Sequence, residues 1–398
     1  MAEKDASAVA ATGRTIPLVP PLYQSSVYLL PDLDAFDRIS TGEEPGFLYV
    51  RDCHPNARLL AEQLAVLEGA SWVLPSGSGM AAVTAVLLSV VEHGDRIVAS
   101  DALHFETAHL LRHALARFGV RTTFVDARDL DAVRDALSEP ARLLWVETMS
   151  NPQLRLVDIE ALAAVCHERS CTLVVDNTLA TPELVKPLEL GADLVVESLT
   201  KMIGGHGDLT VGAVCGRGSF RAQLQAAISD WGLASHPFEC WLAERGLATL
   251  SLRMQTASAN ASALADWLAG QRGVTRVLYP GRADHPDHAL ARRLLPNGFG
   301  NLLCFELAGG RDAVNRFMQQ ASGIPYCTSM GNLTTTCSPA IISQPSDSPV
   351  GHKRLPATGG LIRLSVGVQP LGQIRQEMAR GLAEKVPGQA RAEGAAID

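Results

Sequence analysis

The chain has 398 residues, of which 47% are hydrophobic and 19% are charged, and its formal net charge is -8 at pH 7. This composition is typical of a globular protein, and the length corresponds to about two domains. The negative charge and the lack of a basic cluster argue against a nucleic-acid-binding protein. No apolar run approaches the roughly 20 residues that cross a bilayer, and the N-terminal MAEKDASAVAATGRT lacks the apolar core of a signal peptide. We expect neither a nucleic-acid nor a membrane partner.

Eight cysteines form no CxxC pair and no Cys/His spacing typical of a metal site. Several of them, such as Cys215 and Cys304, lie in apolar runs, where a free thiol behaves as a small hydrophobic group. We therefore expect a reduced, cytoplasmic protein with no metal site. A reactive cysteine remains an alternative.

The N-terminal half of the chain predicts an arm followed by an α/β fold. Residues 1–55 carry turn-forming residues and little periodicity, whereas leucines on one helical face predict a helix from Asn56 to Gly69. Apolar runs then alternate with helical segments: strands are predicted at 72–74, 96–100, 121–125, 143–147, 172–175 and 194–196, and helices at 104–118, 130–137 and 159–168. This alternation indicates βαβ units and a mostly parallel sheet.

Beyond Gly216 the pattern changes. Residues 238–270 predict a long helix interrupted at Gly246. Further strands are predicted at 276–279, 302–307 and 361–366, and further helices at 288–295, 313–320 and 373–385. These elements indicate a second, smaller α/β unit. We therefore divide the chain into an arm at 1–55, a large domain at 56–256 and a small C-terminal domain at 257–398.

The most informative stretch is LVVESLTKMIGGHGDLTVGAVCG, which places Lys201 just after a buried strand and next to the hydroxyls of Ser198 and Thr200. Burial lowers the pKa of a lysine, and such a lysine is a nucleophile that condenses with carbonyl groups. The two hydroxyls can hold an anionic group beside it. The alternative is an ordinary surface lysine at the end of a strand.

Other polar residues follow the predicted strands, and the carboxyl ends of strands carry the ligand site in such sheets. A Gly-Ser turn at Ser78 precedes an apolar helix and suits a phosphate, although glycine is common in α/β turns. Asp176 ends a strand and can pair with a protonated ring nitrogen, and Arg363 in LIRLSVG can bind a carboxylate with two hydrogen bonds. Together with Lys201, these groups fit pyridoxal 5'-phosphate (PLP) acting on an amino acid.

At this point the chain resembles the PLP-dependent enzymes of Cys/Met metabolism: cystathionine gamma-synthase, the cystathionine lyases and methionine gamma-lyase. The resemblance extends from about residue 20 to 385. Its motifs are YVR at 49–51, SGM at 78–80, ETMSNP at 147–152, VDNTLATP at 175–182, SLTK at 198–201, RGLATLSLRM at 245–254 and LIRLSVG at 361–367. It implies a type I PLP-dependent transferase fold with a mostly parallel, seven-stranded sheet.

The resemblance also implies roles for single residues. Lys201 would form a Schiff base with the cofactor and move protons among the substrate carbons, while Asp176 would keep the ring nitrogen protonated. The remaining cofactor-binding residues would be Ser78, Gly79, Met80, Asn151, Ser198 and Thr200, joined by Tyr49 and Arg51 of a neighbouring subunit. Arg363, Ser329 and Tyr49 would contact the substrate. Because the arm would contact the neighbouring subunit, the implied assembly is a homo-oligomer, a dimer or tetramer, with shared active sites.

The chain departs from the family pattern at His104, which stands where a D-x-x-Y-G-x-T segment has its tyrosine. An imidazole can still stack on the cofactor, but its unperturbed pKa is near 6.5 instead of about 10. We predict that His104 binds the cofactor and also acts as a catalytic acid or base. The alternative is a neutral residue that only stacks.

Further departures from the family pattern predict that the part of the site around the distal end of the substrate is altered. His54 and Asn56 flank Pro55 in place of Asn-Pro-Thr, Glu197 replaces a histidine, Met202 replaces an aromatic residue, and SPAIISQP at 338–345 replaces HPASMTHS. We predict gamma-replacement on an activated homoserine derivative or S-adenosylmethionine. The alternative is a degradative carbon-sulfur lyase; an aminotransferase and a non-catalytic PLP-fold protein are weaker alternatives.

Overall fold

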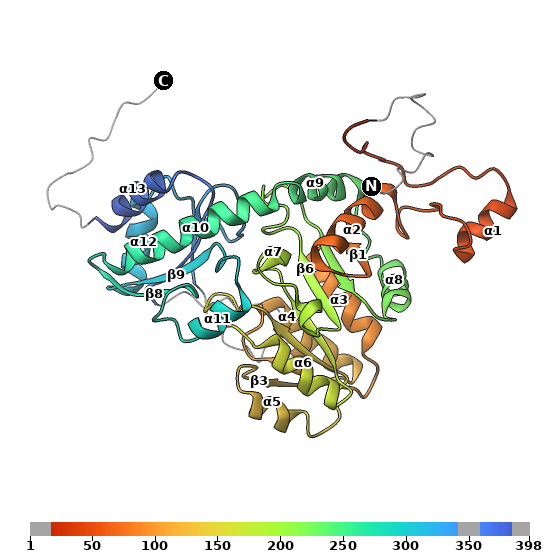
Figure 1. Cartoon of the computed structure of the whole chain (residues 1–398), viewed down its shortest axis with the longest axis horizontal. Coiled ribbons are helices and arrows are strands. Elements are labelled where there is room, and N and C mark those ends of the chain that lie inside the picture. The colour runs from red at the N-terminus through yellow and green to blue at the C-terminus, as the bar shows by residue number, and fades with distance from the viewer. Residues whose placement is uncertain (1–16, 341–358, 384–398) are drawn as a thin grey trace.

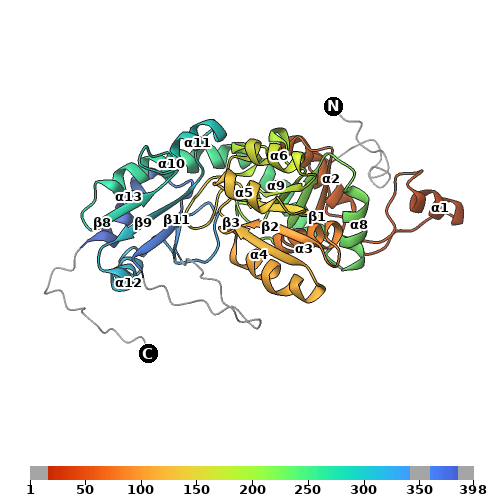
Figure 2. The same cartoon turned by 90° about the horizontal axis from the view of Figure 1, so that it is seen from below.

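The computed structural model describes residues 17–340 and 359–383, and it contains two sheets (Figures 1 and 2). The larger sheet has the strand order β1-β7-β6-β5-β4-β2-β3. Its strands are β1 (Trp72–Ser76), β2 (Arg96–Ser100), β3 (Arg121–Val125), β4 (Leu143–Glu147), β5 (Thr172–Asp176), β6 (Leu194–Ser198) and β7 (Gly212–Gly216). β7 runs antiparallel to β1 and β6, and the other neighbours are parallel. The predicted α/β fold with a mostly parallel sheet is confirmed.

Helices cover both faces of this sheet, which explains why its strands read as continuous apolar runs. Alternate residues of β4 belong to two different cores: Leu144 and Val146 to one, and Leu143 and Trp145 to the other. The first core is closed by α2 (Pro55–Glu68), α6 (Ile159–Glu168) and α9 (Pro237–Leu247), and the second by α3 (Gly79–Val90) and α8 (Arg221–Asp230). α5 (Leu130–Ala136) and the short α7 (Thr181–Leu184) and η4 (Pro187–Leu190) complete this unit.

The smaller sheet is antiparallel, with the order β10-β11-β9-β8. Its strands are β8 (Val274–Leu278), β9 (Leu302–Leu307), β10 (Thr336–Pro339) and β11 (Leu361–Ser365). α10 (Leu250–Ala269), α12 (Gly310–Gln320) and α13 (Leu371–Leu382) share a core with it, and α11 (His288–Leu294) packs toward the larger sheet. Figure 1 shows α10 extending from the larger unit into the smaller one.

Several local expectations differ from the structure. The arm contains a helix, α1 (Leu33–Thr41), and the helix expected at 104–118 consists of α4 (Phe105–His109), a π-helical turn at Leu110–Ala114 and a 3-10 turn at Leu115–Phe118. The break between α9 and α10 falls at 248–249 and not at Gly246. Gly246 serves close packing: a Cβ there would lie 2.6 Å from the carbonyl oxygen of Gly204. Among the described helices, none is long and apolar enough to cross a membrane.

Candidate active site

The candidate site lies at the carboxyl ends of β4, β5 and β6. These strands end at Glu147, Asp176 and Ser198, and Glu147 lies opposite Asp176 in the parallel register. The Oδ1 atom of Asp176 accepts a hydrogen bond from the backbone N–H of Thr178 at 3.0 Å. Desolvation raises the pKa of Asp176, whereas its hydrogen bonds with Thr178 lower it. An acidic group thus stands at the centre of the sheet edge.

Lys201 follows β6 after a short turn and lies half-buried at this edge. Its Nζ atom lies 3.5 Å from the hydroxyl oxygen of Ser329 in the smaller unit. Desolvation and then the positive charge of Arg363 lower the pKa of Lys201, against smaller opposing effects of Glu106 and Cys327. Both leading causes favour the neutral amine, which is the form that attacks a carbonyl carbon.

The segment after Lys201 is held rigidly by Arg253 on α10. The guanidinium donates hydrogen bonds to the carbonyl oxygens of Met202 at 2.5 Å, of Ile203 at 2.8 Å and of Gly246 at 2.8 Å. Because Arg253 is itself buried, this charge-assisted network resists displacement of the turn. The network fixes the lysine backbone relative to α9 and α10.

A candidate anion-binding cradle, formed by Ser78, Gly79 and Met80 at the start of α3, adjoins Ser198. Ser78 caps the N-terminus of α3, and its Oγ atom accepts a hydrogen bond from the N–H of Ala81 at 3.0 Å. A Cβ at Gly79 would lie 2.7 Å from the Cβ of Ser198, so only glycine allows this approach. Met80 follows in the first turn of α3. The N–H groups of this turn are oriented for an anion.

Thr200 lies beside the cradle, but its hydroxyl is already engaged. It donates a hydrogen bond to the carbonyl oxygen of Val211 at 3.2 Å and accepts one from the N–H of Val211 at 3.2 Å. A role as an anion ligand would require this hydroxyl to turn away from Val211.

Arg363 lies on β11 and is buried at the junction of the two units. Its Nη1 donates to the Oδ1 of Asn151 at 3.1 Å, and its Nη2 donates to the carbonyl oxygens of Thr328 at 3.3 Å and Ser329 at 3.2 Å. Its Nε atom is buried and has no hydrogen-bond partner within the described residues. Desolvation lowers the pKa of Arg363. The arrangement leaves donor capacity for a carboxylate.

His104 lies directly before α4, on the same side as the strand ends. Its backbone N–H donates a short hydrogen bond to Oε1 of Glu147, and its Nδ1 lies 3.0 Å from Oε2 of Glu106. The imidazole is 42% exposed. The structure therefore brings His104 to the edge that also carries Asp176 and Lys201.

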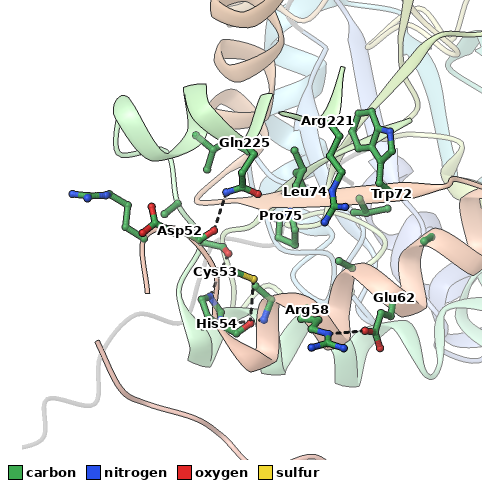
Figure 3. Close-up of a pocket in the computed structure, with 18 of the residues that line it drawn as sticks. Asp52, Cys53, His54, Arg58, Glu62, Trp72, Leu74, Pro75, Arg221 and Gln225 are labelled. Atoms are coloured by element: carbon green, nitrogen blue, oxygen red, sulfur yellow. Dashed lines mark hydrogen bonds and ion pairs between the residues drawn. The ribbon is translucent and has the colours of Figure 1, made fainter. Parts of the chain in front are cut away.

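Tyr49 and Arg51 are not brought to this cluster. They lie on the arm, where the guanidinium carbon of Arg51 lies 5.2 Å from the centroid of the Tyr49 ring. Arg51 also lines a cavity of about 290 Å³ that Asp52, Cys53, Trp72 and Gln225 border (Figure 3). This cavity is separate from the strand-end cluster.

Three residues that we had assigned to the substrate end are in fact structural. Met202 belongs to the main core. His54 caps α2 by accepting a hydrogen bond from Ala57 at 3.1 Å, and burial lowers its pKa to about 4. Glu197 is fully buried against Glu68. Of the segment at 338–345, residues 341–345 lie outside the described residues.

Sequence reasoning missed the partners of several site residues. No role in the site is expected for Glu147 from the sequence, yet Glu147 is buried beside Asp176, and desolvation followed by the charge of Asp176 raises its pKa well above the usual value. Its place as the charged last residue of a buried strand was the signal. Glu106 contacts the His104 ring, which only the tertiary structure reveals.

The residues at this edge fit PLP. Gly79 allows the start of α3 to approach the Ser198 side chain, which a Cβ would prevent. The positive charge of the buried Arg363 lowers the pKa of Lys201, and the Nε atom of Arg363 has no hydrogen-bond partner within the described residues. The carboxyl group of Asp176 ends the central strand, β5. Phosphate, aldehyde and ring nitrogen each find the chemical group that binds them. The site thus defines the class of PLP-dependent enzymes.

Comparisons with known proteins identify the family. Residues 7–383 match the model of the Cys/Met metabolism PLP-dependent enzymes, so the chain belongs to that family and is a PLP-dependent transsulfuration enzyme. It is 39% identical to the O-succinylhomoserine sulfhydrylase of Pseudomonas aeruginosa, over 91% of this chain and 90% of that protein. It is 36% identical to the L-methionine gamma-lyase of Pseudomonas putida, over 92% of both.

A solved structure confirms the fold class. The cystathionine gamma synthase of Xanthomonas oryzae pv. oryzae, solved in complex with aminoacrylate and cysteine, superposes with a TM-score of 0.85 at 31% sequence identity. The match covers 94% of this chain and 95% of that one. The described chain is therefore a type I PLP fold.

Proposed function

We propose that the protein catalyses gamma-replacement on an activated homoserine derivative, with Lys201 as the proton-transferring residue. The observation that carries this proposal is the position of Lys201, half-buried 3.5 Å from Ser329 and under the charge of Arg363. The sulfhydrylase and the cystathionine synthase among its relatives support a homoserine ester as the donor. S-adenosylmethionine is a second candidate donor.

PLP supplies an electron sink that stabilises negative charge on the substrate carbons when it is bound. Asp176 would hold the proton of the ring nitrogen, and the first turn of α3 with Ser198 would bind the phosphate. Arg363 binds the substrate carboxylate, which orients the amino acid toward Lys201. Lys201 would take the proton from the α carbon of the substrate and return protons to carbons further along the substrate. The γ substituent leaves with its bonding electrons, and a nucleophile forms the new bond at the γ carbon.

A gamma-eliminating lyase is the second candidate, and it is supported by the identity to a methionine gamma-lyase. The two reactions differ only in whether a nucleophile or water completes the sequence. O-succinylhomoserine, O-acetylhomoserine, methionine and S-adenosylmethionine, each with and without sulfide, separate them. Mass spectrometry that detects a replacement product only with sulfide supports replacement. Release of 2-oxobutanoate that sulfide does not divert would refute it.

We propose that the enzyme is a homo-oligomer in which the arm at 1–55 contacts a neighbouring subunit, beside a large domain at 56–256 and a small domain at 257–398. The arm exposes many apolar side chains: Leu18, Val19, Leu22, Val27, Leu29, Leu33 and Phe36. Such a surface is typical of a protein interface. Tyr49 and Arg51, which contact each other on the arm, would then bind the phosphate of the partner subunit. The free thiols of all eight cysteines support a cytoplasmic location.

Mixing two inactive variants tests the shared site. Arg51→Ala and Lys201→Ala each disable one component, so a mixed dimer retains one intact site if Arg51 acts across the interface. We expect activity to return on mixing under subunit exchange. Failure to recover activity, with exchange confirmed by mass spectrometry, would show that Arg51 does not serve the Lys201 site of the neighbouring subunit.

A further inference from the structure

Glu106 and His104 form a carboxylate–imidazole pair at the opening of the candidate site. The distance between His104 Nδ1 and Glu106 Oε2 is 3.0 Å, and the two side chains are 42% and 32% exposed. Glu106 lies in the first turn of α4, and His104 directly precedes that helix. The short separation along the chain and the helical start hold the two groups together.

This pair lies within electrostatic reach of Lys201. The negative charge of Glu106 acts on Lys201, where it raises the lysine pKa against the effects of burial and Arg363. The backbone of His104 is tied to Glu147, which is the register partner of Asp176. His104 is thus anchored through its backbone to the strand-end edge that carries Asp176.

A carboxylate at Nδ1 has two effects on an imidazole. It holds the proton on Nδ1, which leaves Nε2 as the acceptor, and it stabilises the imidazolium that forms when Nε2 takes a proton. An isolated ring in a partly exposed position has no such bias. Glu106 acts on His104 in this way when the Nδ1–H is directed at Oε2, 3.0 Å away.

We propose that Glu106 is a positioning residue that holds the His104 imidazole as the acid–base group for the arriving amino acid. This inference rests on the proposed function. An amino acid reaches the site as an ammonium ion and must lose a proton before its nitrogen acts as a nucleophile. Nε2 of His104 takes that proton, so that one N–H bond breaks and another forms, and it returns the proton to the amino group of the product. Glu106 stays ionised throughout.

Charged and titratable groups lie around the imidazole on several elements, and the π-helical turn at Leu110–Ala114 that packs against α4 carries Arg112 and His113. Glu106 and His109 belong to its own helix, Glu147 and Asp176 lie at the adjacent strand ends, and Lys201 and Arg363 lie across the site. α3 packs against α4 but carries no ionisable side chain. Oε2 of Glu106 lies 3.0 Å from Nδ1 of the ring, so Glu106 is the residue to change.

The test is Glu106→Gln in the holoenzyme, compared with Glu160→Gln. Glu160 is likewise a first-turn glutamate, on the exposed side of α6, so it controls for the loss of one negative charge. We expect the acidic limb of the pH profile of kcat/KM to move down by about 1 pH unit in Glu106→Gln, because the imidazolium loses its partner. We expect no movement in Glu160→Gln.

A second measurement does not depend on turnover. NMR with carbon-13-labelled histidine follows the titration of His104, assigned by its absence in His104→Phe. We expect the His104 titration to shift down by the same amount in Glu106→Gln while the visible absorbance of the bound cofactor persists. An unshifted titration would overturn the pairing. A shifted titration with an unchanged pH profile of kcat/KM would overturn the acid–base role of His104. Inactivity of the wild type toward every homoserine ester would refute the proposed gamma-replacement reaction but not the pairing of His104 with Glu106.

Discussion

The two buried glutamates under the site predict an unusual dependence of stability on pH. Glu68 and Glu197 are both fully buried, and none of their four carboxyl oxygens has a hydrogen-bond partner within the described residues. An ionised pair has no donor, so the contact between them becomes a hydrogen bond only when one carboxyl is protonated. Desolvation raises the pKa of Glu68 to about 7, and desolvation followed by the charge of Glu68 raises that of Glu197 well above its usual value.

The sign and size of the effect follow from these pKa values. The unfolded chain releases the Glu68 proton near pH 4.5 and the folded chain near pH 7, so the folded state binds more protons in that window. The pair therefore contributes its full stability below about pH 4.5, and this contribution is lost as pH rises through about 7. At about 1.36 kcal/mol per pH unit, the loss for Glu68 is about 3 kcal/mol.

Glu197→Gln should remove this loss, because the amide N–H can donate to the Glu68 carboxylate. We expect the thermal midpoint of the holoenzyme variant to match the wild type at pH 5 and to exceed it by about 3–6 °C at pH 8. Glu197→His, which allows an ion pair with Glu68, should act in the same direction. Glu160→Gln, on an exposed helix face, is the control. Equal slopes of midpoint against pH in Glu197→Gln and the wild type would refute the proton-sharing pair.

Three further predictions concern the cofactor and the substrate. Lys201→Ala should abolish turnover and the visible absorbance of the lysine-bound cofactor while circular dichroism stays unchanged; a persisting band would contradict the role of Lys201. Arg363→Lys loses the two-pronged guanidinium and should raise KM for the amino acid about 30–100-fold, consistent with about 2–3 kcal/mol for a charge-assisted contact. Gly79→Ala places a Cβ 2.7 Å from the Ser198 Cβ, so equilibrium dialysis should show at least a tenfold weaker affinity for PLP. Unchanged KM or unchanged affinity would contradict the last two assignments.

The sequence predicted the larger sheet because its strands are buried on both faces and read as uninterrupted apolar runs. The elements that it missed lack such a signal. β10 reads TCSP, and its strand conformation depends on pairing with Arg363 and its neighbours in β11. Gly246 was taken for an interruption because glycine weakens helices, yet its purpose is the approach of α9 to the backbone of Gly204. Pairing and close packing between distant segments are tertiary properties that a local pattern does not encode.

The same distinction applies to the residues of the candidate site: those at strand ends could be predicted, and those that depend on tertiary contacts could not. Residues at strand ends, such as Asp176 and Ser198, could be placed because all carboxyl ends of parallel strands reach one edge. The contact of His104 with Glu106 was not foreseen, since the turn geometry before a five-residue helix decides it. Glu197 was wrongly assigned to the substrate end: side chains alternate along a strand, and its side chain packs in the interior against Glu68.

Two side-chain pairs, Glu68 with Glu197 and Glu106 with His104, determine where negative charge lies around Lys201. Glu197 faces Glu68 at a position where a histidine would allow an ion pair. The two buried carboxyl groups instead have raised pKa values, so their protonation is favoured beneath the sheet edge. On the open side, Glu106 adds a carboxylate beside His104, and its charge acts directly on Lys201. Negative charge is thus reduced beneath the candidate site and added beside His104. If the proposed proton removal takes place at His104, the substitutions Glu106→Gln and Glu197→Gln act on opposite sides of the lysine: the first changes the pH dependence of kcat/KM and the second changes the pH dependence of stability.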